Sequence, residues 1–167
     1  MQYLRTCIVA LAFLLFVVPG THARIMPVLT AGVLFNESDF VVIARPVTKT
    51  TDTNEKTYFW DVASVDADGL RHGVPAIGVE TKFKVVRVLK GDFHVTKFVL
   101  HHLRTLIQPA HTITVGGPAT VSFDPFNPNA NKVFLLYLVK ESDGRYAPYG
   151  GQTDPGHNSI FALNNAP

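Results

Sequence analysis

One stretch limits the fold of this chain more than any other: Glu80–Asp92, which reads ETKFKVVRVLKGD. It is rich in β-branched and aromatic residues and stops at a glycine, so it predicts a strand. Side chains alternate between the two faces of a strand, yet Val85–Val86 and Val88–Leu89 place apolar groups on both faces. A strand that coils strongly or carries a bulge changes its buried face along its length, as small closed barrels require. The alternative is a central strand covered on both sides. It fits poorly because the stretch contains four cations: Lys82, Lys84, Arg87 and Lys90. A strand covered on both sides would bury some of them without a partner, which is costly.

The first 23 residues have the pattern of a secretory signal peptide. Arg5 supplies the positive start, Cys7–Val18 is an unbroken apolar run, and small residues precede a cut after Ala23. As a helix this run reaches about 18 Å, short of the roughly 30 Å hydrocarbon core. We therefore predict a leader at residues 1–23, one domain at residues 24–167, and a secreted or periplasmic location without a stable membrane anchor after cleavage. An uncleaved N-terminal anchor is the alternative.

The mature chain has a nearly balanced charge. Fifteen Lys plus Arg, less Arg5, leaves fourteen cations against thirteen Asp plus Glu. The cations form no block along the sequence, which argues against a nucleic-acid partner. The one cysteine, Cys7, leaves with the leader, so the mature domain has no disulfide and no thiol chemistry. This points to a bacterial exported protein rather than an animal extracellular module.

Short strand patterns separated by turn residues fill the mature chain. The expected strands are Ser38–Thr50, Thr57–Val65, Glu80–Asp92, His94–Leu103, Thr112–Val115, Ala119–Phe123, Lys132–Lys140, Arg145–Tyr149 and Ser159–Leu163. Thr48–Lys56 and Gly73–Gly78 are expected to be a turn and a loop, and Asp143-Gly144 suits a hairpin. Arg24–Glu37 predicts a short helix packed against one end of the barrel. The pattern favours an all-β barrel or sandwich.

Three of these segments also resemble a known family. Ser38–Arg45 resembles the first barrel strand of the tissue-inhibitor-of-metalloproteinases (netrin-like) modules, Phe83–Gly91 their strand ending in Lys-Gly, and Lys132–Val139 with Gly144–Tyr146 their hairpin. The pattern is similar to uncharacterised exported bacterial proteins that end in a DGRY…GQ-DP motif. That motif stands here as Asp143–Tyr146 and Gly151–Pro155.

The resemblance spans roughly residues 38–163 and implies a small closed barrel of five to six strands, like the oligonucleotide/oligosaccharide-binding (OB) fold, with a short N-terminal helix. It does not carry protease inhibition. Those inhibitors use an N-terminal cysteine held by disulfides, whereas this mature chain would begin at Arg24 and has no cysteine.

Aromatic residues near glycine-rich loops are the candidate ligand-binding side chains. Tyr146, Tyr149 and the loop Gly150–Pro155, which contains Asp154, are expected to form one rim of the barrel, with Tyr58 and Trp60 added. Rim aromatics contact sugars or peptides in other barrels. Core packing and cross-strand pairing are the alternative roles for the same rings.

The histidines offer a second candidate site. His101 and His111, with a loop carboxylate such as Asp124, would supply three metal ligands, the number that zinc usually takes from a protein. His102 would face away from His101, because adjacent strand residues point to opposite faces. Surface or packing roles compete with this hypothesis, and we predict no metal site.

No nucleophile elbow or phosphate loop is present in the sequence. We therefore expect an exported non-enzymatic binding module without a cofactor, whose partner is an extracytoplasmic protein or glycan. The alternatives are a metal-dependent enzyme using His101 and His111, and a loop-based inhibitor of a secreted hydrolase.

Overall fold

Strands make up most of the computed structural model, which describes residues 29–65, 68–106, 113–115, 122–123, 126–127, 132–150 and 159–163. The elements are α2 (Ala31–Glu37), β1 (Phe40–Pro46), β2 (Thr51–Val65), β3 (Arg71–Lys90), β4 (Lys97–Thr105), β5 (Ile113–Val115), β6 (Val133–Lys140), β7 (Tyr146–Pro148) and β8 (Ile160–Leu163). The chain is therefore all-β with one short helix among the described residues, as the sequence predicts.

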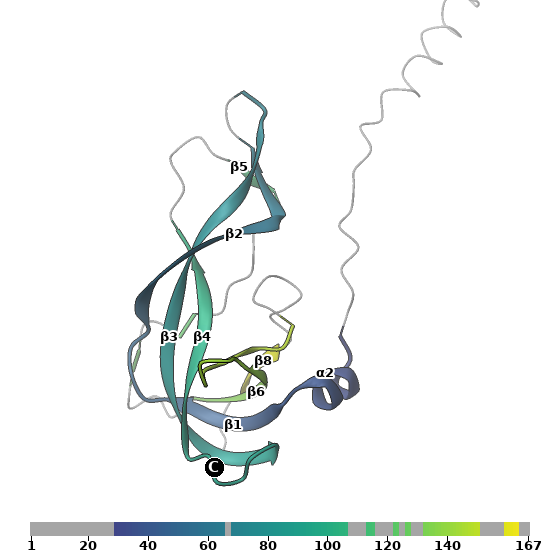
Figure 1. Cartoon of the computed structure of the whole chain (residues 1–167), viewed down its shortest axis with the longest axis vertical. Coiled ribbons are helices and arrows are strands. Elements are labelled where there is room, and N and C mark those ends of the chain that lie inside the picture. Colours follow the sequence, from purple (N-terminus) through teal and green to yellow (C-terminus); the bar gives the residue numbers. More distant parts are fainter. Residues whose placement is uncertain are drawn as a thin grey trace, which may run out of the picture.

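Five strands close into a barrel in the order β1-β6-β7-β4-β3, and β3 pairs with β1 to complete the circle. All of these neighbours are antiparallel except β4 and β7, which are parallel and meet at Leu100 and Tyr146. β2 and β5 continue the sheet beyond β3, and β8 pairs with β6. In Figure 1 the β2–β3 hairpin rises away from the barrel with β5 near its far end, whereas β1, β6 and β8 lie below it and α2 lies beside β1. The predicted small closed barrel is confirmed.

Two bulges let β3 bend around the barrel. Its register against β1 shifts twice, so that Val86 and Leu89 have no partner residue on β1. Val85 and Val88 pack against the core, while Val86 is 53% exposed and Leu89 36%. The two-sided apolar pattern of this strand therefore reflects bulges, because an extra residue changes the face that follows it.

Aromatic rings fill the barrel. Phe83 stacks on Phe98 with centroids 5.4 Å apart, and Phe123 meets Phe83 edge-on at 5.1 Å. Phe40 contacts Phe98 edge-on at 5.7 Å. These rings, with the buried aliphatic side chains of β1, β4 and β6, form the main hydrophobic core. Edge-on and offset stacked rings are the favoured arrangements of aromatic pairs.

Two loop predictions are wrong. Gly73–Gly78, expected to be a loop, lies inside β3, where Pro75 is opposite Tyr58 and Ala76 opposite Thr57. β2 begins at Thr51, so the last six of the nine residues in the expected Thr48–Lys56 turn are strand. Glycine and proline are weak evidence of a loop when a long hairpin partner supplies the backbone hydrogen bonds on the other side. Of the expected strand Ala119–Phe123, the described Ser122 and Phe123 are not in a strand, and the rest lies outside the described residues.

The short helix packs on the side of the barrel rather than at an end. Thr30 caps its first turn by accepting a hydrogen bond from the Val33 N–H. The buried Leu34 contacts Val41 and Tyr137, which alternate with the core residues of β1 and β6 and so face outward. At the other end of the helix, Lys90 Nζ donates to the carbonyls of Phe35 (2.9 Å) and Asn36 (2.7 Å). A cation here satisfies carbonyls that the helix leaves unpaired.

Candidate functional site

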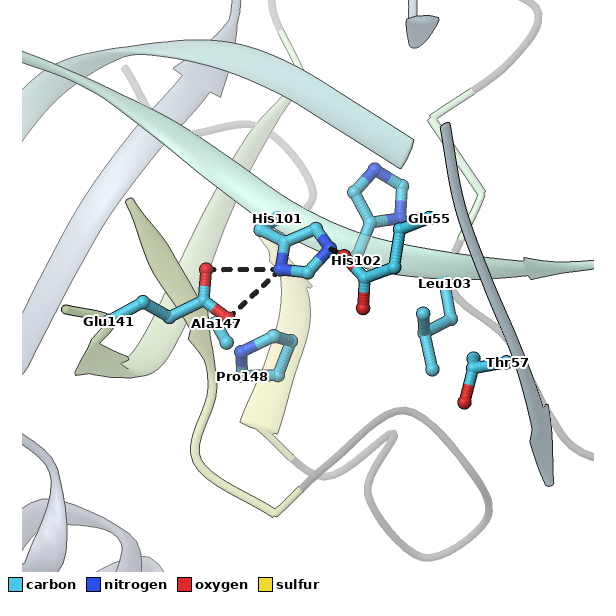
Figure 2. A pocket seen from close by; sticks show the side chains of 8 residues that line it. All are labelled: Glu55, Thr57, His101, His102, Leu103, Glu141, Ala147 and Pro148. Atoms are coloured by element: carbon cyan, nitrogen blue, oxygen red, sulfur yellow. Dashed lines mark hydrogen bonds and ion pairs between the residues drawn. The ribbon is translucent and has the colours of Figure 1, made fainter. Parts of the chain in front are cut away.

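A pocket of about 220 Å³ lies between β2, β4 and the hairpin that joins β6 to β7. Its walls combine two carboxylates, two imidazoles and a threonine with a small apolar surface. Figure 2 shows the lining side chains, which are Glu55, Thr57, His101, His102, Leu103, Glu141, Ala147 and Pro148. Three segments far apart in the sequence thus meet at one site.

His101 lies between two carboxylates at the centre of this pocket (Figure 2). Its Nδ1 is 2.9 Å from Glu141 Oε1, and its Nε2 is 3.0 Å from Glu55 Oε2. The histidine side chain is 9% exposed, while Glu55 is 46% and Glu141 28% exposed. Nε2 and Glu55 Oε2 are close enough for an ion pair, but their directions do not suit a hydrogen bond. This buried nitrogen therefore has no hydrogen-bond partner in the described part of the chain. The imidazole is held from both sides, and the two carboxylates reach the solvent.

Arg145 fixes the hairpin side of the pocket. Its guanidinium is 2.9 Å from Glu80 Oε1 on β3, 2.7 Å from Asp143 Oδ2 and 3.5 Å from Glu141 Oε2. The backbone N–H of Arg145 also bonds the Asp143 carboxylate, which lowers the pKa of Asp143. Arg145 therefore ties the turn to β3 and orients Glu141 toward His101.

His102 faces the barrel interior. Its Nε2 is 2.9 Å from Thr81 Oγ1, and its ring meets Phe123 edge-on at 5.2 Å. Burial lowers the pKa of His102 to about 4, with smaller contributions from the neighbouring His101 and Arg104. The imidazole is thus neutral at pH 7. The two adjacent histidines contact different sides of β4, in agreement with strand alternation.

The predicted aromatic residues lie in different places. Tyr58 is 51% exposed on β2, opposite Pro75. Tyr146 lies inside the barrel, 5.0 Å from the Phe40 ring, and burial raises the pKa of its hydroxyl. Tyr149 is half-buried beside the cluster under α2. The structure does not bring these three rings to one surface. The side chain of Trp60 and all of Asp154 lie outside the described residues, and ligand binding by this set stays a prediction.

The metal hypothesis is only partly covered by the structure. His111 and Asp124 lie outside the described residues, so the structure gives no distance from His101 to either of them. Within the described ranges, no group of three or more His, Cys, Asp or Glu side chains has an arrangement that could hold a metal ion.

Sequence reasoning missed Glu55 and Glu141 as site residues. Glu55 falls in a segment expected to be a turn, and Glu141 stands beside a hairpin turn, where a carboxylate is unremarkable. The one usable signal is that Glu141 lies two residues before the predicted Asp143-Gly144 hairpin turn, because hairpin ends bring side chains to the rim of a sheet. No local pattern relates either glutamate to His101.

Comparison with known proteins adds no identification. No family model, no curated protein and no solved structure matches this chain. In the described ranges no helix has both the length and the apolar character needed to span a membrane.

Proposed function

We propose that this chain is an exported, non-enzymatic binding module, and that the pocket around His101 is its ligand site. The observation that carries the proposal is the clamped histidine: both ring nitrogens lie 2.9–3.0 Å from carboxylates. A general base must reach the proton that it removes. Glu141 binds Nδ1 and the Glu55 carboxylate lies in front of Nε2, so a ligand reaches neither nitrogen without displacing a carboxylate. This favours a fixed role for the imidazole in a binding surface.

Export rests on the leader-like residues 1–23 and implies a secreted or periplasmic location. The closed five-stranded barrel supports the proposed OB-like assignment and the resemblance to tissue-inhibitor-of-metalloproteinases (netrin-like) modules. A barrel of this kind provides a rigid frame on which hairpins and loops present a ligand site. The partner would be an extracytoplasmic protein or glycan.

The charge of the pocket favours a cationic ligand group. Glu55 and Glu141 place two carboxylates in its walls. The neighbouring Arg145 is already paired with Glu80 and Asp143, so it does not leave the pocket positively charged. The remaining walls include apolar side chains (Leu103, Ala147 and Pro148). An apolar stem with a cationic end would match this combination. We therefore favour a protein partner that inserts a lysine side chain.

A direct test uses Nα-acetyl-lysine amide as the probe, with binding followed by NMR chemical shifts of the pocket amides. The chain from Arg24 should show saturable shifts around His101 and Glu141. The Glu55→Gln and Glu141→Gln variants should bind more weakly, since each removes one charge that faces the ammonium group. Glu37→Gln is the matched control, because Glu37 is an exposed glutamate at the end of α2.

Two results would contradict the proposal. Equal shifts in the Glu37→Gln and pocket variants would mean that the probe binds elsewhere. One zinc ion per purified chain, lost in a His101→Ala variant, would instead favour the metal-dependent enzyme that uses His101 and His111.

A further inference from the structure

Strand pairing gathers five cations on one outer surface of the barrel, which we call the basic face. In one row across three strands, Arg45 of β1 is opposite Lys84 of β3, and Lys84 is opposite Lys97 of β4. Lys82 and Arg87 stand before and after Lys84 on β3. The basic face is thus Arg45, Lys82, Lys84, Arg87 and Lys97, all exposed.

This arrangement is unfavourable for the isolated protein. Like charges directly opposite each other on neighbouring strands destabilise a sheet, and here three cations stand in one row. Within the described ranges none of the five makes an ion pair with a carboxylate. Lys90 on the same strand differs, because it caps α2. The basic face therefore has no comparable role inside the fold.

A groove of about 470 Å³ runs through the basic face. Val47 and Val99 line it together with Lys82, Lys84 and Lys97. Lys82 lies between the two valines, since its carbonyl accepts from Val47 N–H and it pairs with Val99. An apolar wall bordered by three ammonium groups matches a phosphate that carries an apolar or neutral substituent.

Exposed apolar side chains lie between the cations of β3 and follow them along the chain. Val86, 53% exposed, stands between Lys84 and Arg87 because of the bulge described above, and Leu89 is 36% exposed. Phe93, 71% exposed, follows in the turn after β3. A soluble polyanion would gain little from these residues. A bilayer interface offers anionic headgroups and an apolar boundary to the same surface.

We propose that the basic face is a docking surface for an anionic phospholipid bilayer, with a headgroup phosphate seated in the groove. This is peripheral binding, and it is independent of the pocket around His101. Single-stranded nucleic acid is the less suitable occupant, because stacking of successive bases needs exposed rings along the groove itself, and the exposed Phe93 does not line it. The two aromatic residues that border the groove, Phe83 and Phe98, are buried in the barrel.

The test is vesicle co-sedimentation of the chain from Arg24, which contains every described element and lacks the apolar leader. Vesicles of phosphatidylglycerol and phosphatidylcholine should bind it, and pure phosphatidylcholine vesicles should not. Each cation near an anionic surface contributes about fivefold to the partition coefficient. The double variant Lys84→Gln/Lys97→Gln should therefore bind about 25-fold more weakly.

The matched control is Lys56→Gln/Lys140→Gln, which removes the same charge from two exposed lysines outside the basic face. It should bind nearly as well as the parent chain. Phe93→Ser should weaken binding to anionic vesicles without changing the net charge. The Lys84/Lys97 variant should also unfold at an equal or higher temperature than the parent, because it relieves like-charge repulsion, so its weaker binding would not reflect unfolding.

Equal losses of vesicle binding in the two double variants would overturn the proposal, since the effect would follow net charge and not the basic face. Binding to soluble dextran sulfate without binding to anionic vesicles would also overturn it. That outcome would assign the face to an acidic glycan.

Discussion

Replacing Gly91 by alanine should damage the closure of the barrel at one identified point. Gly91 directly follows β3 and has φ +101, a value that residues with a side chain rarely adopt. A Cβ atom there would lie 2.6 Å from the Asp39 carbonyl oxygen and 3.0 Å from Phe40 Cδ2. Phe40 is a fully buried core residue at the start of β1. The new methyl group would therefore push against the backbone and the core together.

The cost has two parts. The unfavourable backbone conformation contributes about 1–3 kcal/mol, and the clash with a packed core contributes about 1–3 kcal/mol more. We expect Gly91→Ala to lower the free energy of unfolding by about 4 kcal/mol in all. Domains of this size have about 5–15 kcal/mol, so the variant should remain folded but with a much lower urea midpoint.

Gly144→Ala is the matched control for this measurement. Gly144 has φ +90 in the hairpin turn, and a Cβ atom there would meet no heavy atom within 4 Å. It should lose only the backbone part, about 1–3 kcal/mol. Urea unfolding followed by far-UV circular dichroism gives both values. If Gly91→Ala loses no more stability than Gly144→Ala, the argument from the close approach to Asp39 and Phe40 is refuted.

Two further predictions concern His102 and Lys90. Burial lowers the pKa of His102 from 6.5 to about 4, so the folded protein loses about 3 kcal/mol of stability as the pH falls from 6.5 toward 4. Urea unfolding at pH 7 and pH 4 should show this decrease. The decrease should be smaller in His102→Gln and unchanged in His94→Gln, a control at an exposed site. Lys90→Met removes two hydrogen bonds to the end of α2 and should lower the stability of this helix by about 1 kcal/mol. Hydrogen exchange should become faster at residues 34–37 and stay unchanged in β4. Unchanged exchange in α2 would contradict the prediction.

Strand positions were the most predictable part of this fold. β1, β4, β6 and β8 lie within four residues of the expected ranges at each end, because alternation and turn residues are local signals. The bulges in β3 were also foreseeable, since Val85–Val86 and Val88–Leu89 cannot all face one side of a regular strand. The extended β2–β3 hairpin was missed. Its glycines and Pro75 read as a loop, and only pairing with β2 makes them strand.

The candidate site was much less predictable. Sequence reasoning selected His101 but paired it with His111 and Asp124 as metal ligands. In the structure its described neighbours are Glu55 and Glu141. Both glutamates reach His101 because a register shift of β2 between Asp52 and Lys56 places Glu55 over Gly78 of β3, and because the β6–β7 hairpin brings Glu141 to β4. Neither event has a local sequence signature, since both depend on pairing between distant strands.

The stretch Glu80–Asp92 shows where the two levels divide. Its residues by themselves determined a strand with bulges and a glycine end, because β propensity, alternation and the φ of Gly91 are properties of a short segment. They also contained three cations of the basic face, yet the charges of the chain looked scattered along the sequence. Only the tertiary structure placed Arg45 and Lys97 on either side of Lys84. Cross-strand neighbours are chosen by register between separate segments, so a charged surface of this kind exists only after the barrel has closed.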